Sequence, residues 1–599
     1  MSCSSTTHRR FREEPSILQS PRWPLLVLFL LAFTVRLVHL VTMRNSPFFQ
    51  YPIMDSLIHD EWAWTIASGG ETPWHPPFFR APLYPYFLAL IYSVFGHSHT
   101  WARIVQMVLG SVSVVLVFAI GRRIFDQRVA WIAGLLACFY WMFVYYEGEL
   151  LIVPLILFLN LAGLLLLIGA LEKPGALRFF LVGLLFGMSA IARPNILLFP
   201  AALVVWLLLR HRRAGLASLA KSAAPLVSGL VLAILPVTAA NTLSGDPVLI
   251  ASQGGVNFYI GNNAESDAIR AVVPGTRSDW WGGYHDTVLM AEQARGRSLK
   301  PSEVSNYWYG RGIEFITSQP RKAARLFLRK FCLFWNHREF GNNQDIYFIQ
   351  ERSPVLRALS MAGFGIIAPF GLIGMGLAWR RLRPSRMLSV FVVVYMLSVI
   401  LFFVNARYRM PVVPVLLVFA AYAGTMIFDK IKCRDLRGIA APGVMILLLT
   451  VAVNTNFHGL EKSNAAFGHY SLGLTYRHAG EPDRAIEEFL KALDHEPDRR
   501  DARFNLAIAF IETGRSAQAE AMLRELVSRY PEDAESRYAL GNAMAAMGDL
   551  DTAVRELSVA ISLRPYYYEA WHSLGVAQYG SGRLEEAEAS FRRALEIHP

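Results

Sequence analysis

The sequence predicts an all-α membrane protein in which a bundle of about eleven transmembrane helices precedes a soluble helical solenoid. Long apolar segments recur up to about residue 455, basic residues gather in alternate loops, and a 34-residue repeat fills residues 466–599. Only 17% of the 599 residues are charged and 54% are hydrophobic, whereas an average soluble chain has about 25% charged residues. Because the basic residues of this +12 chain gather at span ends, membrane topology accounts for them and no nucleic-acid partner is expected.

The chain begins with a basic tail, residues 1–23, which we expect to remain in the cytoplasm because it carries His8, Arg9, Arg10, Arg12 and Arg22. The first span, residues 24–42, follows it. A run of about 19 apolar residues is long enough to cross a bilayer, and it exceeds the about 7–15 residues of a signal-peptide core. We therefore interpret it as a retained membrane span.

Ten further spans are predicted from the apolar segments that follow. They lie at 101–121, 129–146, 149–170, 177–193, 196–210, 222–240, 357–379, 387–404, 410–428 and 438–454. Every second connecting loop is rich in Lys and Arg, as cytoplasmic loops are. From a cytoplasmic N-terminus, an odd number of spans leaves the C-terminal repeats outside the cytoplasm.

Two long exterior loops are predicted, at residues 43–100 and 241–356, within a membrane domain that covers residues 24–455. The first contains Leu83–Phe95, whose about 13 apolar residues suit an interfacial or re-entrant helix better than a span. The second contains a basic amphipathic stretch, residues 320–335, which suits the membrane surface. Loops of this length often carry function.

A linker, residues 456–465, leads to four repeats that begin at residues 466, 500, 534 and 568. Position 8 of the repeat is small (Gly473, Ala507, Gly541, Gly575), position 20 is alanine, and position 32 is proline. This is the tetratricopeptide pattern, in which small residues let two helices approach and proline ends the second. Such arrays commonly bind extended peptides on their concave face. The alternative is that the array only stabilises or dimerises the protein.

The candidate catalytic residues begin just outside the first span. Asp55 and His59 are four residues apart, so they share one face if this stretch is helical, whereas Asp60 turns partly away. A carboxylate at the mouth of a membrane bundle can act as a general base when its orientation is fixed. The alternative is a solvated acidic loop.

Charged residues at three other predicted outer edges converge on the same side. Glu147 and Glu149 begin the fourth span, Arg193 separates the fifth and sixth, and Arg407 and Arg409 begin the tenth. Charges at membrane depth are costly and usually mark function, although interfacial anchoring is the alternative. The planar donor forks of arginine suit a phosphate group.

The spacing of Asp55, His59, Ala63 and Gly69, followed by Arg80-Ala81-Pro82-Leu83-Tyr84-Pro85, resembles the dolichyl-phosphate-mannose-protein mannosyltransferase group of the GT-C glycosyltransferases. The stretches around Glu149, Arg193-Pro194 and Arg407-Tyr408-Arg409 are similar to bacterial members, and the likeness covers about residues 24–430. His59 stands where tyrosine is commoner, and Phe79 stands where the lipid A aminoarabinose transferases carry a glutamate.

The resemblance implies a GT-C-like fold and an inverting sugar transfer from a polyprenyl-phosphate donor to a hydroxyl acceptor. Asp55 would be the base, and Glu149, Glu147 or Asp60 the second acid. Substrate-binding roles would fall to the residues His59, Glu147, Arg80, Arg193, Arg407 and Arg409. No cofactor is certain, although a divalent cation is compatible with the pattern, and no residue is assigned to a metal.

The expected location is the inner membrane of a bacterium, with the repeats outside the cytoplasm recruiting an acceptor protein or peptide, or another partner. Membrane lipid would surround the spans. The alternative function from a different class is a non-catalytic scaffold for the assembly of cell-envelope polymers. Sugar transfer, or its absence, would distinguish the two.

Overall fold

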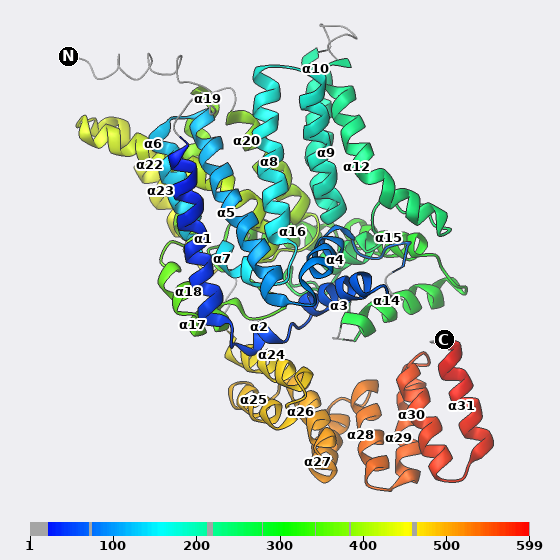
Figure 1. Ribbon diagram of the computed structural model, residues 1–599. Helices are drawn as coiled ribbons and strands as arrows, with labels where there is room; N and C mark the ends of the chain where they lie inside the picture. Colours follow the sequence, from blue (N-terminus) through cyan, green and yellow to red (C-terminus); the bar gives the residue numbers. More distant parts are fainter. Residues whose placement is uncertain are drawn as a thin grey trace. The chain divides into compact units, whose positions relative to one another are not determined.

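The computed structural model describes residues 22–70, 75–211, 220–277, 280–341, 343–381, 385–457 and 464–597, which contain helices and no strand (Figure 1). The described chain divides into a membrane unit, within residues 1–45 and 54–462, and a repeat unit, residues 46–53 and 463–599. The all-α class is therefore confirmed. Most of the predicted cytoplasmic tail (1–23) and of the linker (456–465) lies outside the described residues.

The membrane unit contains helices of very different length. From the first span to the end of the first loop they are α1 (Trp23–Met43), α3 (Asp55–Ser68) and α4 (Leu83–Phe95). The following bundle contains α5 (His99–Ile124), α6 (Gln127–Phe139), α7 (Trp141–Gly148), α8 (Val153–Glu172), α9 (Ala176–Ala192), η1 (Pro194–Leu197), α10 (Leu198–His211) and α12 (Ala223–Leu243). The second loop contains α13 (Gly254–Gly261), α14 (Trp280–Arg295), α15 (Pro301–Ser318), α16 (Pro320–Trp335), α17 (Ile346–Arg352) and α18 (Pro354–Leu359). The last part contains α19 (Phe364–Arg381), α20 (Ser385–Ile400), α21 (Ala406–Arg409), η2 (Met410–Val412), α22 (Val413–Lys432) and α23 (Leu436–Asn454).

Six helical segments of the described chain are long and apolar enough to cross a membrane, and the number becomes seven if the bent pair α6 and α7 forms one span. The remaining four predicted spans coincide with apolar helices of 10–17 residues, among them α9, α10 and α20. Breaks at residues such as Pro194 shorten these helices, because proline cannot donate the backbone hydrogen bond that continues a helix. The count of about eleven spans remains a prediction.

Close packing of small residues joins α9 to α12. A Cβ added to Gly183 would lie 1.9 Å from the carbonyl oxygen of Leu226, and one added to Gly229 would lie 2.0 Å from that of Phe180. In lipid, the hydrophobic effect does not drive helices together, so their association depends on close packing. Small residues four apart, such as Gly183 and Gly187, let the two helix backbones approach closely. Figure 1 shows α8, α9 and α12 running side by side.

The repeat unit contains the short helix α2 (Pro47–Gln50) and four helix pairs. These are α24 (Ala465–His478) with α25 (Pro482–His495), α26 (Arg500–Glu512) with α27 (Ser516–Arg529), α28 (Ala534–Ala546) with α29 (Leu550–Leu563), and α30 (Tyr568–Gly580) with α31 (Leu584–Ile597). Each helix packs against the next along the chain, and α2 packs against α24. The four predicted tetratricopeptide repeats are confirmed in register.

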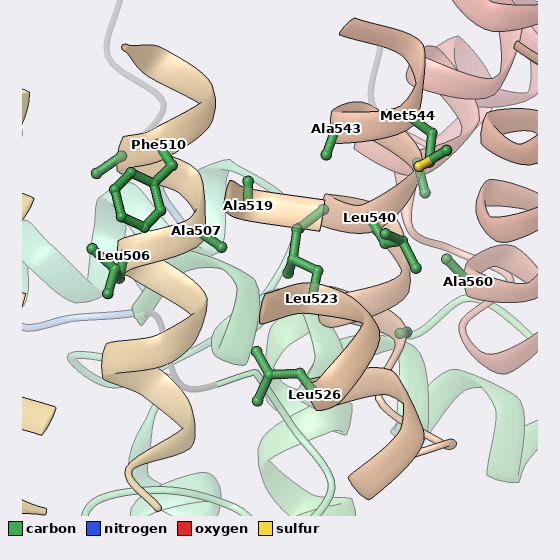
Figure 2. Packing of buried hydrophobic residues seen from close by; sticks show 14 of the residues in the cluster. Leu506, Ala507, Phe510, Ala519, Leu523, Leu526, Leu540, Ala543, Met544 and Ala560 are labelled. Carbon is green, nitrogen blue, oxygen red and sulfur yellow. The ribbon is translucent and has the colours of Figure 1, made fainter. Parts of the chain in front are cut away.

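The core of each repeat depends on the small residues of the pattern. A Cβ on Gly473 would lie 2.6 Å from the Phe489 ring, and one on Gly541 would lie 2.6 Å from Leu557, so glycine permits the close approach of the paired helices. Figure 2 shows Leu523 and Ala519 of α27 among the side chains of α26 and α28. The leucine is fully buried.

We expect Leu523→Ala to lower the free energy of unfolding of the repeat unit by about 2–5 kcal/mol, because it removes buried methyl groups and leaves a cavity. Hydrogen exchange across α26–α28 in the full-length protein measures the effect. Leu490→Ala is the matched control, since Leu490 is 46% exposed. Equal exchange in both variants would show that the array lacks the packed core described above.

Candidate functional site

The helix that carries Asp55 begins at a strained residue. Met54, the N-cap of α3, has φ 54° and ψ −129°, which is unusual for a residue other than glycine. Such strain costs about 1–3 kcal/mol and tends to occur at functional sites. Asp55 is the first residue of α3, where the positive end of the helix dipole favours its negative charge, and Gly69 ends the helix with φ 72°.

Two arginines from distant parts of the sequence hold the carboxylate of Asp55. Nη1 of Arg80 donates to Oδ1 at 2.8 Å, and Nη1 of Arg407 donates to Oδ2 at 2.5 Å. Asp55 is 6% exposed. Arg80 precedes α4 and Arg407 lies in α21, so this cluster joins the first loop to the start of the predicted tenth span.

The arginine pair determines the ionisation of Asp55. Burial alone would raise the pKa of this carboxyl, but the nearby charges of Arg80 and Arg407 outweigh burial and hold the pKa well below its usual value. Asp55 is therefore a carboxylate in this arrangement, and it is a weak base as long as both arginines contact it.

A third arginine extends the positive cluster. Arg193 lies over the ring of Tyr408, with its guanidinium carbon 4.4 Å from the ring centroid, and Nη2 of Arg407 donates to the Tyr408 hydroxyl at 3.4 Å. Among the described residues, the buried donors Nη1 of Arg193 and Nε of Arg407 have no hydrogen-bond partner. Buried donors without partners are costly, so their presence favours a site for an anionic ligand.

His59 lies one turn after Asp55 on the same face of α3. Its Nδ1 is 3.2 Å from the carbonyl oxygen of Leu150, which requires Nδ1 to carry the proton and leaves Nε2 as an acceptor. Its ring meets Tyr84 edge-on, with the centroids 4.9 Å apart. Burial is the main reason that the pKa of His59 falls to about 4, so the imidazole is neutral at physiological pH.

This pKa predicts acid sensitivity. Because the folded-state pKa of about 4 lies below the unfolded value of 6.5, the unfolded state binds more protons between these values and stability falls as pH decreases from 6.5 to 4. The contribution of His59 is up to about 3 kcal/mol. We expect the unfolding temperature of His59→Gln in detergent to depend less on pH between 6.5 and 4 than that of the wild type. His75→Gln, at an exposed position, should show the same pH dependence as the wild type. Equal acid sensitivity of wild type and His59→Gln would contradict this account.

Glu149 lies next in sequence to a residue that contacts His59 and interacts with the charge of Arg103, whereas Glu147 lies in a separate ion pair. Glu149 directly precedes Leu150, the partner of His59, and is 6% exposed. Glu147 instead forms a buried ion pair with Arg36 of α1, in which Nη2 of Arg36 donates to Oε1 at 3.1 Å. Glu147 is therefore engaged in holding α1 to α7.

Arg409 and Asp60 also have partners of their own. Nη2 of Arg409 contacts Oε2 of Glu339 at 2.6 Å, and its Nη1 donates to the carbonyl oxygens of Phe334 and Asn336. Asp60 accepts a hydrogen bond from Tyr92 and lies beside two histidines. Thus Asp55, Arg80 and Arg407 form one cluster with Arg193 beside it, and Arg409, Glu147 and Asp60 belong to three others.

Sequence reasoning missed several residues that the structure brings in, namely Arg36, Glu339, His97 and His99. The sequence could have predicted a buried partner for Arg36, because a charge in the middle of an apolar span requires one. The histidines also gave a signal, since two histidines two residues apart stand at the start of an apolar helix. Nothing local in the sequence indicated Glu339.

Comparisons with known proteins agree with this organisation. The sequence model of the dolichyl-phosphate-mannose-protein mannosyltransferase family matches residues 75–239, and two tetratricopeptide repeat models match residues 476–543 and 538–599. The first match includes Arg80, Glu149 and Arg193, whereas Asp55 and Arg407 lie outside it. No curated protein sequence matches the chain.

Among solved structures, the crystal structure of MamA is 29% identical, with a TM-score of 0.21, and the match covers 22% of this chain and 78% of that one. A thermophilic tetratricopeptide protein of Thermus thermophilus is 26% identical, with a TM-score of 0.22, covering 22% and 75% respectively. The first tetratricopeptide domain of human RPAP3 is 23% identical, with a TM-score of 0.20, covering 20% and 96%. Each of these three likenesses covers about a fifth of this chain.

Proposed function

We propose that this chain, which joins a mannosyltransferase-family membrane region to tetratricopeptide repeats, transfers a sugar from a polyprenyl-phosphate donor to a hydroxyl group of a protein acceptor. The proposal depends on one observation: Arg80 and Arg407 both form ion pairs with the Asp55 carboxylate, and Arg193 lies next to them over the Tyr408 ring. A base and a cationic phosphate site would thus lie side by side.

The arginines suit the phosphate of a lipid-linked donor. Guanidinium groups bind phosphate through parallel donors, and the partnerless buried donors of Arg193 and Arg407 offer hydrogen bonds that no described residue accepts. In a site shielded from water, such donors stabilise negative charge far better than they would in bulk solvent. The polyprenyl chain would lie among the apolar helices.

Donor binding would also activate the base. A phosphate that takes hydrogen bonds from Arg407 and Arg80 competes with Asp55 for the same donors, so the pKa of Asp55 rises towards its ordinary value when the donor is bound. Asp55 would then be a strong enough base only in the presence of its substrate. In the free enzyme, the two arginines would keep Asp55 deprotonated until the donor binds.

The chemical step follows from these positions. Asp55 accepts the proton of the acceptor hydroxyl, and the hydroxyl oxygen forms a bond to C1 of the sugar. The bond from C1 to the phosphate oxygen breaks, and its electron pair leaves with the polyprenyl phosphate, whose charge Arg407 and Arg193 stabilise. One displacement at C1 inverts its configuration.

Of the remaining candidates, Glu149 and His59 would take part in the reaction and Arg409 would not. Glu149 is the second acid that we favour, because it directly precedes Leu150, the hydrogen-bond partner of His59. Glu149 also interacts with the charge of Arg103, whereas Glu147 is paired with Arg36 and Asp60 with Tyr92 and two histidines. Nε2 of the neutral His59 is suited to accept a hydrogen bond from a sugar or acceptor hydroxyl. Arg409 supports the fold through Glu339 and takes no part in the proposed step.

The repeats would recruit the acceptor. Tetratricopeptide arrays commonly bind extended peptides, so an unfolded or flexible acceptor segment is the kind of substrate that they would present. We place the site and the repeats outside the cytoplasm, in the inner membrane of a bacterium, because the basic loops assign the opposite face to the cytoplasm.

The test is a transfer assay with the purified full-length protein in lipid. A panel of radiolabelled polyprenyl-phosphate sugars is supplied together with a membrane and periplasmic extract as acceptor. We expect label in protein with at least one donor. Label in glycan or lipid alone would overturn the acceptor class, and no label with any donor, from protein shown to be folded, would favour the scaffold.

A further inference from the structure

A second polar cluster lies on the other side of α3. Nε2 of His97 is 3.1 Å from both carboxylate oxygens of Asp60, and Nε2 of His99 is 3.1 Å from Oδ2. One ligand atom from each of the three residues lies within 4.8 Å of the other two. Asp60 is 5% exposed, whereas His97 reaches the surface with a side chain that is 36% exposed.

We propose that Asp60, His97 and His99 bind a divalent transition-metal ion of the Zn²⁺ class. Zn²⁺ takes imidazole nitrogen and carboxylate oxygen at about 2.0–2.2 Å in a tetrahedral arrangement, in which neighbouring ligand atoms are about 3.3 Å apart. The 3.1 Å separations between Oδ2 of Asp60 and the two imidazole nitrogens are close to that value. Two histidines and one carboxylate also form a ligand set that suits Zn²⁺.

The surroundings of the cluster support ligation. The Tyr92 hydroxyl donates to Oδ1 of Asp60 at 2.5 Å, which leaves Oδ2 directed at the histidines. The Trp64 ring stacks on His97 with the centroids 4.7 Å apart and fixes that imidazole. Hydrogen bonds to a ligating carboxylate and packing against a ligating imidazole are typical of groups that orient metal ligands. Three protein ligands leave a fourth position on the exposed side for water.

The ion would hold α3 in place. Asp55 and Asp60 are five residues apart, which separates them by about 140° around a helix at about 100° per residue. A metal that ties Asp60 to His97 and to His99, the first residue of α5, would therefore fix the rotation of α3 and so the direction in which Asp55 points. Asp60 would be a positioning residue, and this role alone rests on the proposed function.

Metal content tests the site without any measurement of transfer. Full-length protein in lipid nanodiscs is stripped with a chelator, equilibrated with ZnCl₂ and analysed by elemental mass spectrometry. We expect about one equivalent in the wild type and in His75→Ala, an exposed histidine of the same loop, and a loss of affinity of at least about tenfold in His99→Ala. No bound zinc in the wild type, or equal zinc in His99→Ala, would overturn the proposal.

A second variant shows ligation by a gained signal. In His97→Cys, a thiolate would replace an imidazole ligand, so Co²⁺-loaded protein should acquire the sulfur-to-cobalt charge-transfer absorption that the wild type lacks. Absence of that band from folded His97→Cys would count against direct ligation. Hydrogen exchange of α3, measured with and without metal, then reports positioning, and unchanged exchange would remove that role. Both readouts stand even if no sugar is transferred.

Discussion

Replacing Asp55 with asparagine is expected to reduce sugar transfer by about 10²–10⁴-fold, because the amide cannot accept the proton of the acceptor hydroxyl. The side chain keeps its size, so α3 should still begin at the same residue. The rate of label transfer with saturating donor measures the loss, and near-ultraviolet circular dichroism checks the fold.

Glu61→Gln is the matched control for this prediction. It makes the same carboxylate-to-amide change on the same helix, but Glu61 is exposed and lies outside the arginine cluster. Its transfer rate should stay within about twofold of the wild type, as surface changes usually do. Full activity of Asp55→Asn would remove Asp55 as the base.

Arg407→Gln should be the second most damaging change, with a loss of about 10²–10³-fold in kcat, because it removes a donor that stabilises the leaving phosphate. It also leaves Oδ2 of Asp55 without the partner that lies at 2.5 Å. Arg407→Lys should recover only part of the activity, since lysine keeps the charge but lacks the planar donor fork.

The control for charge alone is Arg128→Gln. Arg128 pairs with Asp429, but its side chain is 60% exposed, and exposed ion pairs contribute about 0–1 kcal/mol. Its kcat should match that of the wild type. Arg407→Lys with unreduced kcat would mean that a point charge is sufficient and that the bidentate contact to phosphate is absent.

Local patterns explain why parts of this fold could be predicted. Apolar length predicts spans and a repeat period predicts paired helices, because both depend on residues close in sequence. Thus Leu83–Phe95 was expected as a 13-residue apolar helix and forms one, and the small residue at Gly473 indeed faces Phe489. The four shorter apolar helices lie where spans were predicted, but whether each crosses the membrane remains a prediction.

The candidate site could be predicted only as a list of residues. The 3.6-residue period placed Asp55 and His59 on one face, but no local rule pairs Asp55 with Arg407, 352 residues later. The same limit explains why Arg409 was grouped with the phosphate ligands. Arg407 points to Asp55, whereas Arg409 points to Glu339, because residues two apart on a helix point about 160° away from each other.

Asp55 and the donor phosphate are proposed to share the same arginines, and one binding measurement tests this directly. The affinity of a polyprenyl phosphate without sugar is measured for wild type, Asp55→Asn and Glu61→Gln in nanodiscs. If Asp55 competes with phosphate for Arg80 and Arg407, Asp55→Asn should bind about tenfold more tightly than the wild type, although it transfers sugar far more slowly. Glu61→Gln should bind as the wild type does. Equal or weaker binding by Asp55→Asn would contradict the account.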